Sequence, residues 1–161
     1  MLVQIRNKFT GQVIFEADSG TTIEAIESAV ATGVDLAEAD LSGSNLARAA
    51  LAGARLGLAD LTGANLSGAD LSEAYMPGVK LNSADLYGVN ARKVNLSGAD
   101  LSDANLRNAN LAWARLTMTN LSETNLTNAN LFGAMLISRY LIDATGRQGT
   151  PRDQRRQHVL V

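Results

Sequence analysis

The chain has 161 residues, of which 46% are hydrophobic, 4% are aromatic and none is cysteine, and its formal net charge at pH 7 is -2. The hydrophobic fraction is too high for an intrinsically disordered chain, and the length suits one folded domain. The lack of cysteine excludes a disulfide framework, a thiolate metal site and a cysteine nucleophile. Aromatic residues are scarce for a compact core, so something small and regular must fill the interior.

Residues 1–33 are expected to form two elements. Residues 2–9 and 12–17 are rich in Val, Ile and Phe and flank Thr10-Gly11, which predicts a β-hairpin. The sequence TTIE from Thr21 reads as a capping box, the apolar residues that follow share one helical face, and Gly33 is a natural stop, which predicts a short helix. This segment contains no secretory signal, and no run of about eighteen apolar residues occurs anywhere, so we expect a cytoplasmic protein without a membrane span.

From Val34 onward the sequence repeats every five residues. An apolar residue recurs at 36, 41, 46 and every fifth position to 141, which makes 22 positions without an insertion or deletion. Twenty of them are Leu, and the exceptions are Met76 and Ala91. The residue two positions earlier is Ala in fourteen units and Val in four, Asp or Asn stands between the two in fifteen units, and Gly ends eight units.

Neither the 3.6-residue period of a helix nor the alternation of a strand places every fifth residue on one side. A chain that turns after each short straight segment can place every fifth residue on the same side, with the Leu and the small residue of each unit pointing inward. Asp and Asn suit such turns because their side chains bond neighbouring backbone groups, and Gly tolerates a positive φ. If the coils stack about 4.8 Å apart with paired backbones, the fold is all-β, a β-solenoid filled with Leu and Ala.

The unit Ala-(Asp or Asn)-Leu-x-x resembles that of the pentapeptide-repeat proteins, over residues 34–143. The resemblance implies a right-handed quadrilateral β-helix with four units per coil, so 22 units give about five and a half coils, or roughly 26 Å of rod. Both ends of a solenoid need covering. We therefore divide the chain into an N-terminal cap, 1–33, the β-helix, 34–143, and a mobile basic tail, 144–161; the first part could instead be a partner-binding module of its own.

With four units per coil, residues twenty apart lie above one another and one side of the rod is acidic. This candidate acidic face carries six carboxylates, with Lys80 opposing them: Asp40, Asp60, Asp100, Asp103, Glu123 and Asp143. The other three sides are near neutral. The acidic face is either a docking surface for a basic partner or a side that is merely solvated.

The last two coils carry apolar residues at positions that are polar earlier in the rod. They form a candidate patch for dimerisation or for packing of the tail: Trp113, Met118, Phe132, Met135, Ile137, Tyr140 and Ile142. A patch of this kind is larger than a monomer usually leaves exposed, so a second chain or the terminal segment covers it. Relatives often dimerise end to end at this end of the rod, which implies a homodimer.

The sequence contains few candidates for catalytic residues. His158 is the only histidine and lies four residues from the end, and the recurring Asp, Ser and Thr are required by the repeat, so we predict no catalytic residue, no cofactor and no metal site. The tail has four arginines but no aromatic residue to read bases, so we expect no direct nucleic-acid binding.

Three functions from different classes follow. The first is a non-enzymatic scaffold that presents flat faces to a protein partner whose identity is unknown. The resemblance adds a second, a DNA mimic of the quinolone-resistance type that binds gyrase or another topoisomerase. The rod carries too few negative charges for a good mimic, since duplex DNA carries one charge per about 1.7 Å of its axis. An enzyme is the third.

Overall fold

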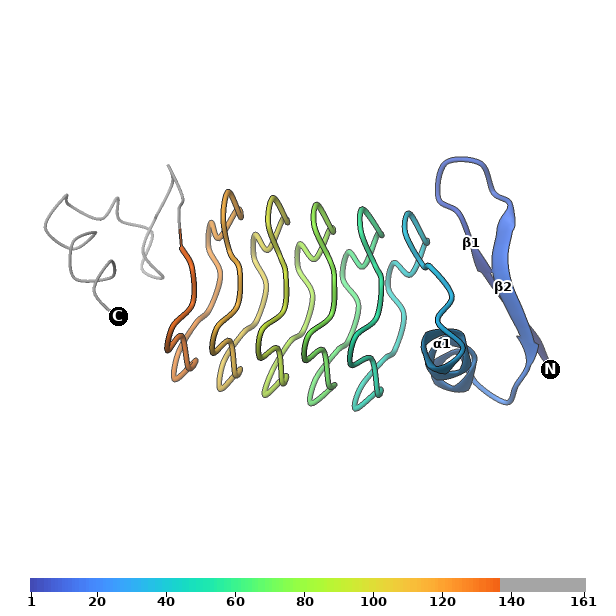
Figure 1. Cartoon of the computed structure of the whole chain (residues 1–161), viewed down its shortest axis with the longest axis horizontal. Coiled ribbons are helices and arrows are strands. Elements are labelled where there is room, and N and C mark those ends of the chain that lie inside the picture. Colours follow the sequence, from blue (N-terminus) through green and yellow to red (C-terminus); the bar gives the residue numbers. More distant parts are fainter. Residues whose placement is uncertain (137–161) are drawn as a thin grey trace, which may run out of the picture.

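The structure is a computed structural model that describes residues 1–136; the last residues of the predicted β-helix and the predicted tail lie outside the described residues. Its elements in chain order are β1 (Leu2–Arg6), β2 (Val13–Asp18) and α1 (Thr22–Ala31), followed by the repeat. Figure 1 shows the hairpin and the helix at one end of a stack of coils. The structure confirms the hairpin, the helix and the solenoid; the boundaries of the three parts stay a prediction.

The hairpin pairs β1 with β2 antiparallel, from Leu2 opposite Asp18, with an irregularity at Ile5 and Arg6. The prediction that the first strand continues to Phe9 is wrong. Asn7 turns the chain, because its Oδ1 accepts the backbone N–H groups of Phe9 and Thr10, at 2.9 and 3.0 Å. The strand therefore ends at Arg6.

On either side of Asn7, at the end of β1, the hairpin also pairs with the first coil. The backbone N–H of Lys8 donates to the carbonyl of Glu38, and the N–H of Asp40 donates to the carbonyl of Arg6. Backbone pairing therefore connects the hairpin to the rod.

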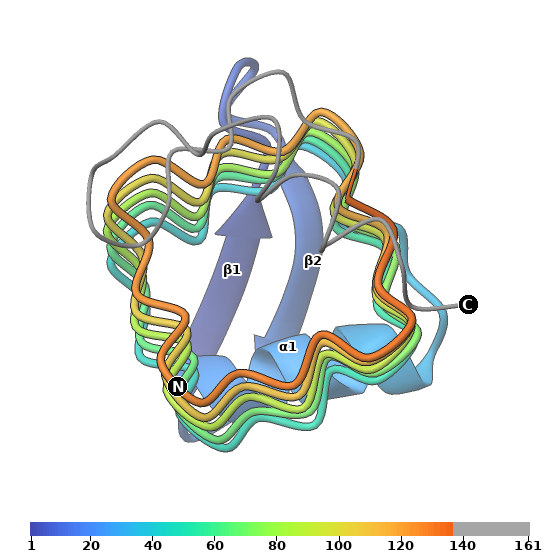
Figure 2. The ribbon, with the colours of Figure 1, turned by 90° about the vertical axis from the view of Figure 1, so that its left-hand side faces the viewer.

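Helix α1 covers the first coil. The side chain of Thr21 accepts the N–H of Glu24 at 3.2 Å, whereas the Glu24 carboxylate accepts the N–H of Gly20 at 2.7 Å instead of that of Thr21. The predicted capping box is thus only half formed, since the returning carboxylate reaches one residue further back. Ile26 is fully buried in the same core cluster as the leucines of the repeat. Figure 2, which looks along the stack, shows α1 and the hairpin behind the coils.

The coils pair through parallel backbone bridges between residues twenty positions apart, such as Asn45 with Asn65 and Asn95 with Arg115. The same spacing recurs from Asp40 to Met135. Two hydrogen bonds of 2.8 Å illustrate the pattern, from the N–H of Leu41 to the carbonyl of Asp60 and from the N–H of Asp60 to the carbonyl of Ala39. Four units therefore separate one paired position from the next.

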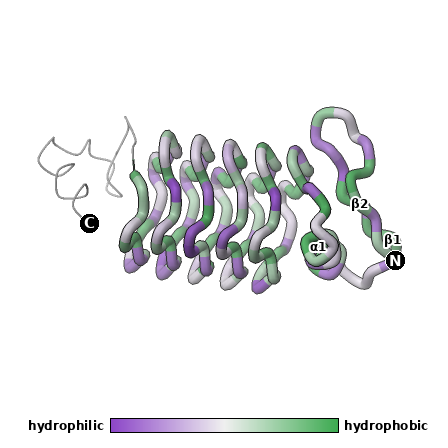
Figure 3. The backbone as a smooth tube through the Cα atoms, in the orientation of Figure 1, coloured by the Kyte–Doolittle hydropathy of each residue, from purple (hydrophilic) through white to green (hydrophobic). Residues whose placement is uncertain are grey.

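The interior is a stack of Leu and small residues. The central apolar residues from Leu36 to Leu116 are at most 4% exposed, and the Ala or Val residues two positions earlier are similarly buried, apart from the partly buried Val34. Thr119 and Thr124 take this small-residue position with their hydroxyls satisfied, since they donate to the carbonyls of Leu96 and Leu101 at 2.8 and 2.7 Å. Figure 3 shows hydrophobic and hydrophilic residues alternating around each coil, as the inward and outward positions require.

Every described unit turns at the two residues that follow its central apolar residue. In all twenty units centred on residues 36 to 131, the second residue after the central one has a φ between 57° and 69°. A positive φ at the third residue of a four-residue turn is typical of a type II turn, which favours Gly. Gly occupies the position in eight units, as predicted, but twelve units place another residue there, including Trp113 and Met118.

The Asp and Asn residues prepare these turns. The Oδ1 of Asp40 accepts the N–H of Ser42 at 3.2 Å, and the Oδ1 of Asp70 accepts the N–H of Ser72 at 2.9 Å. Most units with Asp or Asn repeat this bond, which is the local turn that these side chains favour. Their predicted role is confirmed, although they stand just before the turn rather than within it.

Candidate functional site

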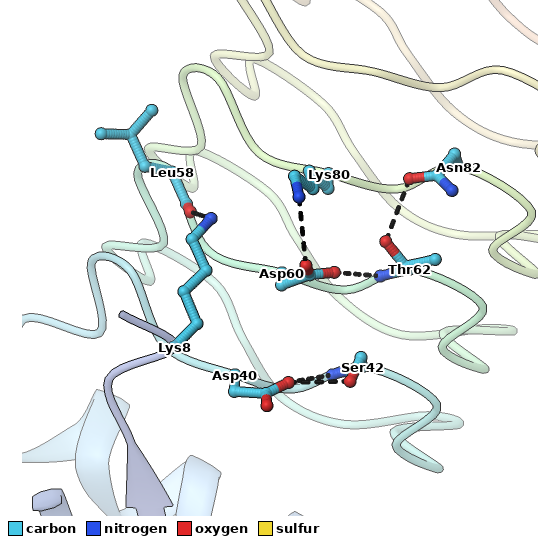
Figure 4. A network of polar contacts seen from close by, with 8 residues as sticks. All are labelled: Lys8, Asp40, Ser42, Leu58, Asp60, Thr62, Lys80 and Asn82. Carbon is cyan, nitrogen blue, oxygen red and sulfur yellow. Dashed lines mark hydrogen bonds and ion pairs between the residues drawn. The ribbon is translucent and has the colours of Figure 1, made fainter. Parts of the chain in front are cut away.

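The acidic face begins as one column of stacked residues. Backbone bridges join Asp40 to Asp60, Asp60 to Lys80, Lys80 to Asp100 and Asp100 to Asn120. Figure 4 shows Asp40, Asp60 and Lys80 on successive coils with their side chains on the same side of the rod. The structure thus brings together three of the six predicted carboxylates through a spacing of twenty residues.

Lys80 partly neutralises this column. Its Nζ lies 3.5 Å from Oδ2 of Asp60. Partial burial raises the pKa of Asp60, but contacts with the side chain and the backbone N–H of Thr62 and the charge of Lys80 outweigh it, so the pKa lies below its ordinary value of 3.8. Asp60 is therefore ionised at neutral pH and already has a cationic partner within the chain.

Asp103 and Glu123 form a second column, at the adjoining turn. Both have the positive φ of the turn position, and both are exposed. They stack on successive coils, since the N–H of Asp103 donates to the carbonyl of Ser122 at 3.0 Å. The sixth predicted carboxylate, Asp143, lies outside the described residues. Within residues 1–136 the acidic face thus has five carboxylates and one lysine, a net charge of -4.

A second lysine approaches this face from the hairpin. The Nζ of Lys8 donates to the carbonyl oxygen of Leu58, two residues before Asp60 in the chain, as Figure 4 shows. Sequence reasoning missed this contact because the two residues are fifty positions apart, and no periodic signal links the hairpin to the repeat. The N-terminal end of the acidic face is therefore less negative than its C-terminal end.

The structure brings together part of the predicted apolar patch. The rings of Trp113 and Phe132 meet edge to face with centroids 5.3 Å apart. A Cβ on Gly133 would lie 2.5 Å from the Trp113 ring, so the absence of a side chain there lets the indole lie flat on the next coil. Met118 and Met135 are also exposed, and Ile137, Tyr140 and Ile142 lie outside the described residues.

The aromatic residues of the rod face outward, as the composition predicts. Tyr75, Tyr87, Trp113 and Phe132 are each about half exposed. Tyr87 also accepts a hydrogen bond from Nδ2 of Asn108 at 2.9 Å. The narrow interior thus excludes aromatic side chains from every coil that the structure describes.

Residues 1–136 contain no group of three or more His, Asp or Glu placed to hold a metal ion. No helix within them is long and apolar enough to cross a membrane. The outward side chains of the described coils form columns, because positions twenty residues apart are paired through the backbone.

Comparison with known proteins agrees with this architecture. The family model for pentapeptide repeats matches in eight copies, over residues 27–63, 54–90, 64–103, 84–117 and 104–138. No curated relative matches the chain. Proteins of this family form right-handed β-helix solenoids.

Several solved structures are similar to the chain. HetL, a pentapeptide repeat protein involved in heterocyst differentiation regulation from the cyanobacterium Nostoc sp. strain PCC 7120, is 32% identical over 71% of this chain and 55% of HetL, with a TM-score of 0.43. A pentapeptide repeat protein from the thylakoid lumen of Arabidopsis thaliana is 31% identical over 65% of this chain and 69% of its own, with a TM-score of 0.33. QnrB1, a plasmid-mediated fluoroquinolone resistance protein, is 19% identical over 76% of this chain and 85% of its own, with a TM-score of 0.41.

The chain spans little more than half the length of HetL, so it shares with that protein the repeat and not the whole molecule. The evidence for the family is the repeat itself: the family model matches across most of the chain, and the coils pair with the regularity that the repeat requires. The chain therefore belongs to the pentapeptide repeat family.

Proposed function

We propose that the protein is a non-enzymatic, cytoplasmic interaction scaffold that presents flat faces of the solenoid to a protein partner. The argument rests on how the side chains divide between inside and outside. Two residues of each unit fill the core, and the remaining three face outward in columns that the backbone pairing holds in register. Pentapeptide repeat proteins are in general structural or interaction proteins, which agrees with this assignment.

The observation that carries the proposal is the acidic face. Coils stack about 4.8 Å apart, and the carboxylates occupy two pairs of adjacent coils, Asp40 with Asp60 and then Asp100 and Asp103 with Glu123, on either side of the coil that carries Lys80. Such an array complements a row of Lys or Arg on a partner, and charge complementarity of this kind speeds encounter and selects the partner. The partner is therefore proposed to be a protein with a basic surface.

The test neutralises the C-terminal half of this face. We expect a variant with Asp100→Asn, Asp103→Asn and Glu123→Gln to lose proteins that wild type captures after crosslinking in the native cell. A matched control removes three carboxylates elsewhere on the rod, through Asp70→Asn, Glu73→Gln and Asp85→Asn, and should keep them. If the first variant recovers the same proteins as wild type, the acidic face is merely solvated.

The full shape of the rod belongs to the same proposal. A four-sided cross-section and about five and a half coils are supported by the spacing of twenty residues between bridged positions, which is four units. Flat sides matter to the function because they let a partner contact residues of several coils at once.

We propose further that two copies associate through the C-terminal end. In support, Leu126, Leu131 and Leu136 of the last described coil are only partly buried, whereas the equivalent leucines of inner coils are fully covered. Light scattering at micromolar concentration should give about twice the chain mass of 17.0 kDa. Ile137→Asp with Ile142→Asp should return the protein to a monomer, and a wild type that is already monomeric would refute the dimer.

The alternative function is a DNA mimic that binds gyrase or another topoisomerase. The column from Asp40 to Asn120 spans four steps between coils, roughly 19 Å, over which duplex DNA carries on the order of eleven charges. The acidic face has a net charge of -4 within residues 1–136, so the mimic is short of charge. Gyrase supercoiling assays, with and without a quinolone, test it: no effect at tens of micromolar protein excludes the mimic.

A further inference from the structure

One unit near the C-terminal end presents an outward surface unlike that of its neighbours. Its inward residues, Ala114 and Leu116, are buried in the usual way. Its outward positions hold Trp113 at the preceding turn, Arg115 in the bridged row and Met118 at its own turn. In most units these positions hold Gly, Asn or Asp, so the unit exposes a tryptophan, an arginine and a methionine where the repeat needs none of them.

Packing within the fold does not account for Met118 and accounts only in part for Trp113. Their φ values are 63° and 59°, a left-handed conformation that disfavours bulky L residues. Met118 is 82% exposed, so its burial does not offset this cost. Met118 therefore occupies a position that both the backbone and the solvent disfavour, and Trp113 stays half exposed although it contacts Phe132 and Gly133.

The next coil extends this surface. Phe132 meets Trp113 edge to face, and Met135 pairs with Arg115 through a backbone bridge. We name these five residues the Trp113 patch: Trp113, Arg115, Met118, Phe132 and Met135. Aromatic residues, Met and Arg are the types enriched in the centres of protein interfaces, where Trp and Arg supply much of the binding energy.

Arg115 stands out among the cations of the bridged rows. Arg55 pairs with Asp35 at 3.1 Å and Lys80 with Asp60 at 3.5 Å, each with the carboxylate twenty residues earlier. The corresponding residue for Arg115 is Asn95, and within residues 1–136 Arg115 forms no ion pair. The guanidinium is therefore a charged donor among apolar side chains, without the carboxylate that the other two have.

We infer that the Trp113 patch docks a segment of a partner protein in which an Asp or Glu stands between large apolar residues. The carboxylate would meet Arg115, and the apolar residues would pack on Trp113, Phe132 and the two methionines. The Trp113 patch contains no carboxylate, so a second copy of it would offer Arg115 no ion-pair partner, which disfavours a second copy as the occupant. The inference rests on the proposed scaffold function and names a second surface with its partner chemistry.

The test selects peptides against the full-length protein. A phage library of random twelve-residue peptides is panned on wild type, with counter-selection on an Arg115→Glu variant. We expect enriched sequences with Asp or Glu flanked by Leu, Phe, Trp or Met. A synthetic peptide of the consensus should bind wild type at least tenfold more tightly than Arg115→Gln or Trp113→Ser, while Arg107→Gln, which removes an exposed arginine two units away around the coil, should bind like wild type.

Three results would overturn the inference. They are no enrichment, as expected if residues 137–161 or a second copy cover the patch; a basic consensus; or equal binding to wild type and to Arg115→Gln. Replacing Asp100, Asp103 and Glu123 by Asn, Asn and Gln separates the two proposals. If the peptide still binds that variant, the Trp113 patch is supported independently of the acidic face. If no peptide binds but capture of crosslinked partners still depends on those carboxylates, the scaffold function is supported and the Trp113 patch is not.

Discussion

At the scale of single residues, the repeat imposes unequal demands on its five positions. The two inward positions accept only side chains that fit a narrow tube, and the position before the central residue favours a side chain that bonds the following turn. The turn position requires a positive φ but no particular side chain, which is why residues as different as Gly98, Lys93 and Trp113 occupy it. Recognition residues can therefore be exchanged there with a known conformational cost.

Gly98→Ala should measure that cost. The φ of Gly98 is 69° and nothing lies within 4 Å of a Cβ added there, so the change adds backbone strain without a clash. We expect the free energy of unfolding in urea to fall by about 1 kcal/mol. Gly57→Ala is the matched control, because Gly57 lacks a positive φ and its Cβ would meet Pro77 at an ordinary 3.7 Å. Equal losses in both variants would contradict the conformational explanation.

The Asp70 carboxylate gives a residue-scale prediction about pH. Hydrogen bonds from the side chain and backbone N–H of Ser72, and from Asn90, lower the pKa of Asp70 below its ordinary 3.8, against partial burial that raises it. Because the folded pKa is the lower one, the stabilisation is present above pH 3.8 and is lost as the pH falls through the folded value. Asp70→Asn should therefore lose less stability than wild type between neutral pH and about pH 2.

Urea unfolding at a series of pH values checks this prediction. Asn is a fair replacement because Asn90, the next residue of the same column, already accepts a bond of 3.3 Å from Asn110. Wild type and variant curves that fall in parallel on the acid side would show that Asp70 does not contribute to the acid sensitivity.

At the scale of elements, the sequence predicted what is periodic and missed what is not. The spacing of five residues is visible in the Leu and Ala pattern, and the resemblance to pentapeptide-repeat proteins implies the stacking at twenty, so the placement of Asp40, Asp60 and Lys80 in one column could be foreseen. The early end of β1 depends on the side chain of Asn7, and the contact of Lys8 with Leu58 depends on how the hairpin docks. Neither leaves a signal in a linear pattern.

Substitutions in helix α1 test whether it stabilises the rod as a cap. Ile26 is fully buried against the first coil, so Ile26→Ala should lower the free energy of unfolding by about 2–5 kcal/mol, the usual cost of emptying such a site. Ser28→Ala, on the exposed side of the same helix, should change it by less than about 0.5 kcal/mol. A small loss for Ile26→Ala would mean that α1 is an independent attachment rather than a cap.

At the scale of the whole molecule, a net charge of -2 conceals an uneven distribution. Carboxylates gather on one face toward its C-terminal half, while aromatic and sulfur-containing side chains gather beside Arg115. Because the core is nearly the same in every described coil, these differences between faces can distinguish one partner from another. The scarcity of aromatic residues reflects the narrow core, and the few present lie where contact is possible.

The most direct test moves the charge without changing its amount. One variant combines Asp100→Asn, Asp103→Asn and Glu123→Gln with Asn125→Asp, Asn108→Asp and Asn128→Glu, which carry the three carboxylates to the next face. Asn108 and Asn128 are the equivalents of Asp103 and Glu123, and Asn125 lies in the equivalent bridged row one coil further along. Net charge and repeat pattern are unchanged, and circular dichroism and urea unfolding should match wild type. We predict that crosslinked capture from the native cell then loses the partners of wild type. Capture of the same proteins at the same yield would contradict recognition by a defined face.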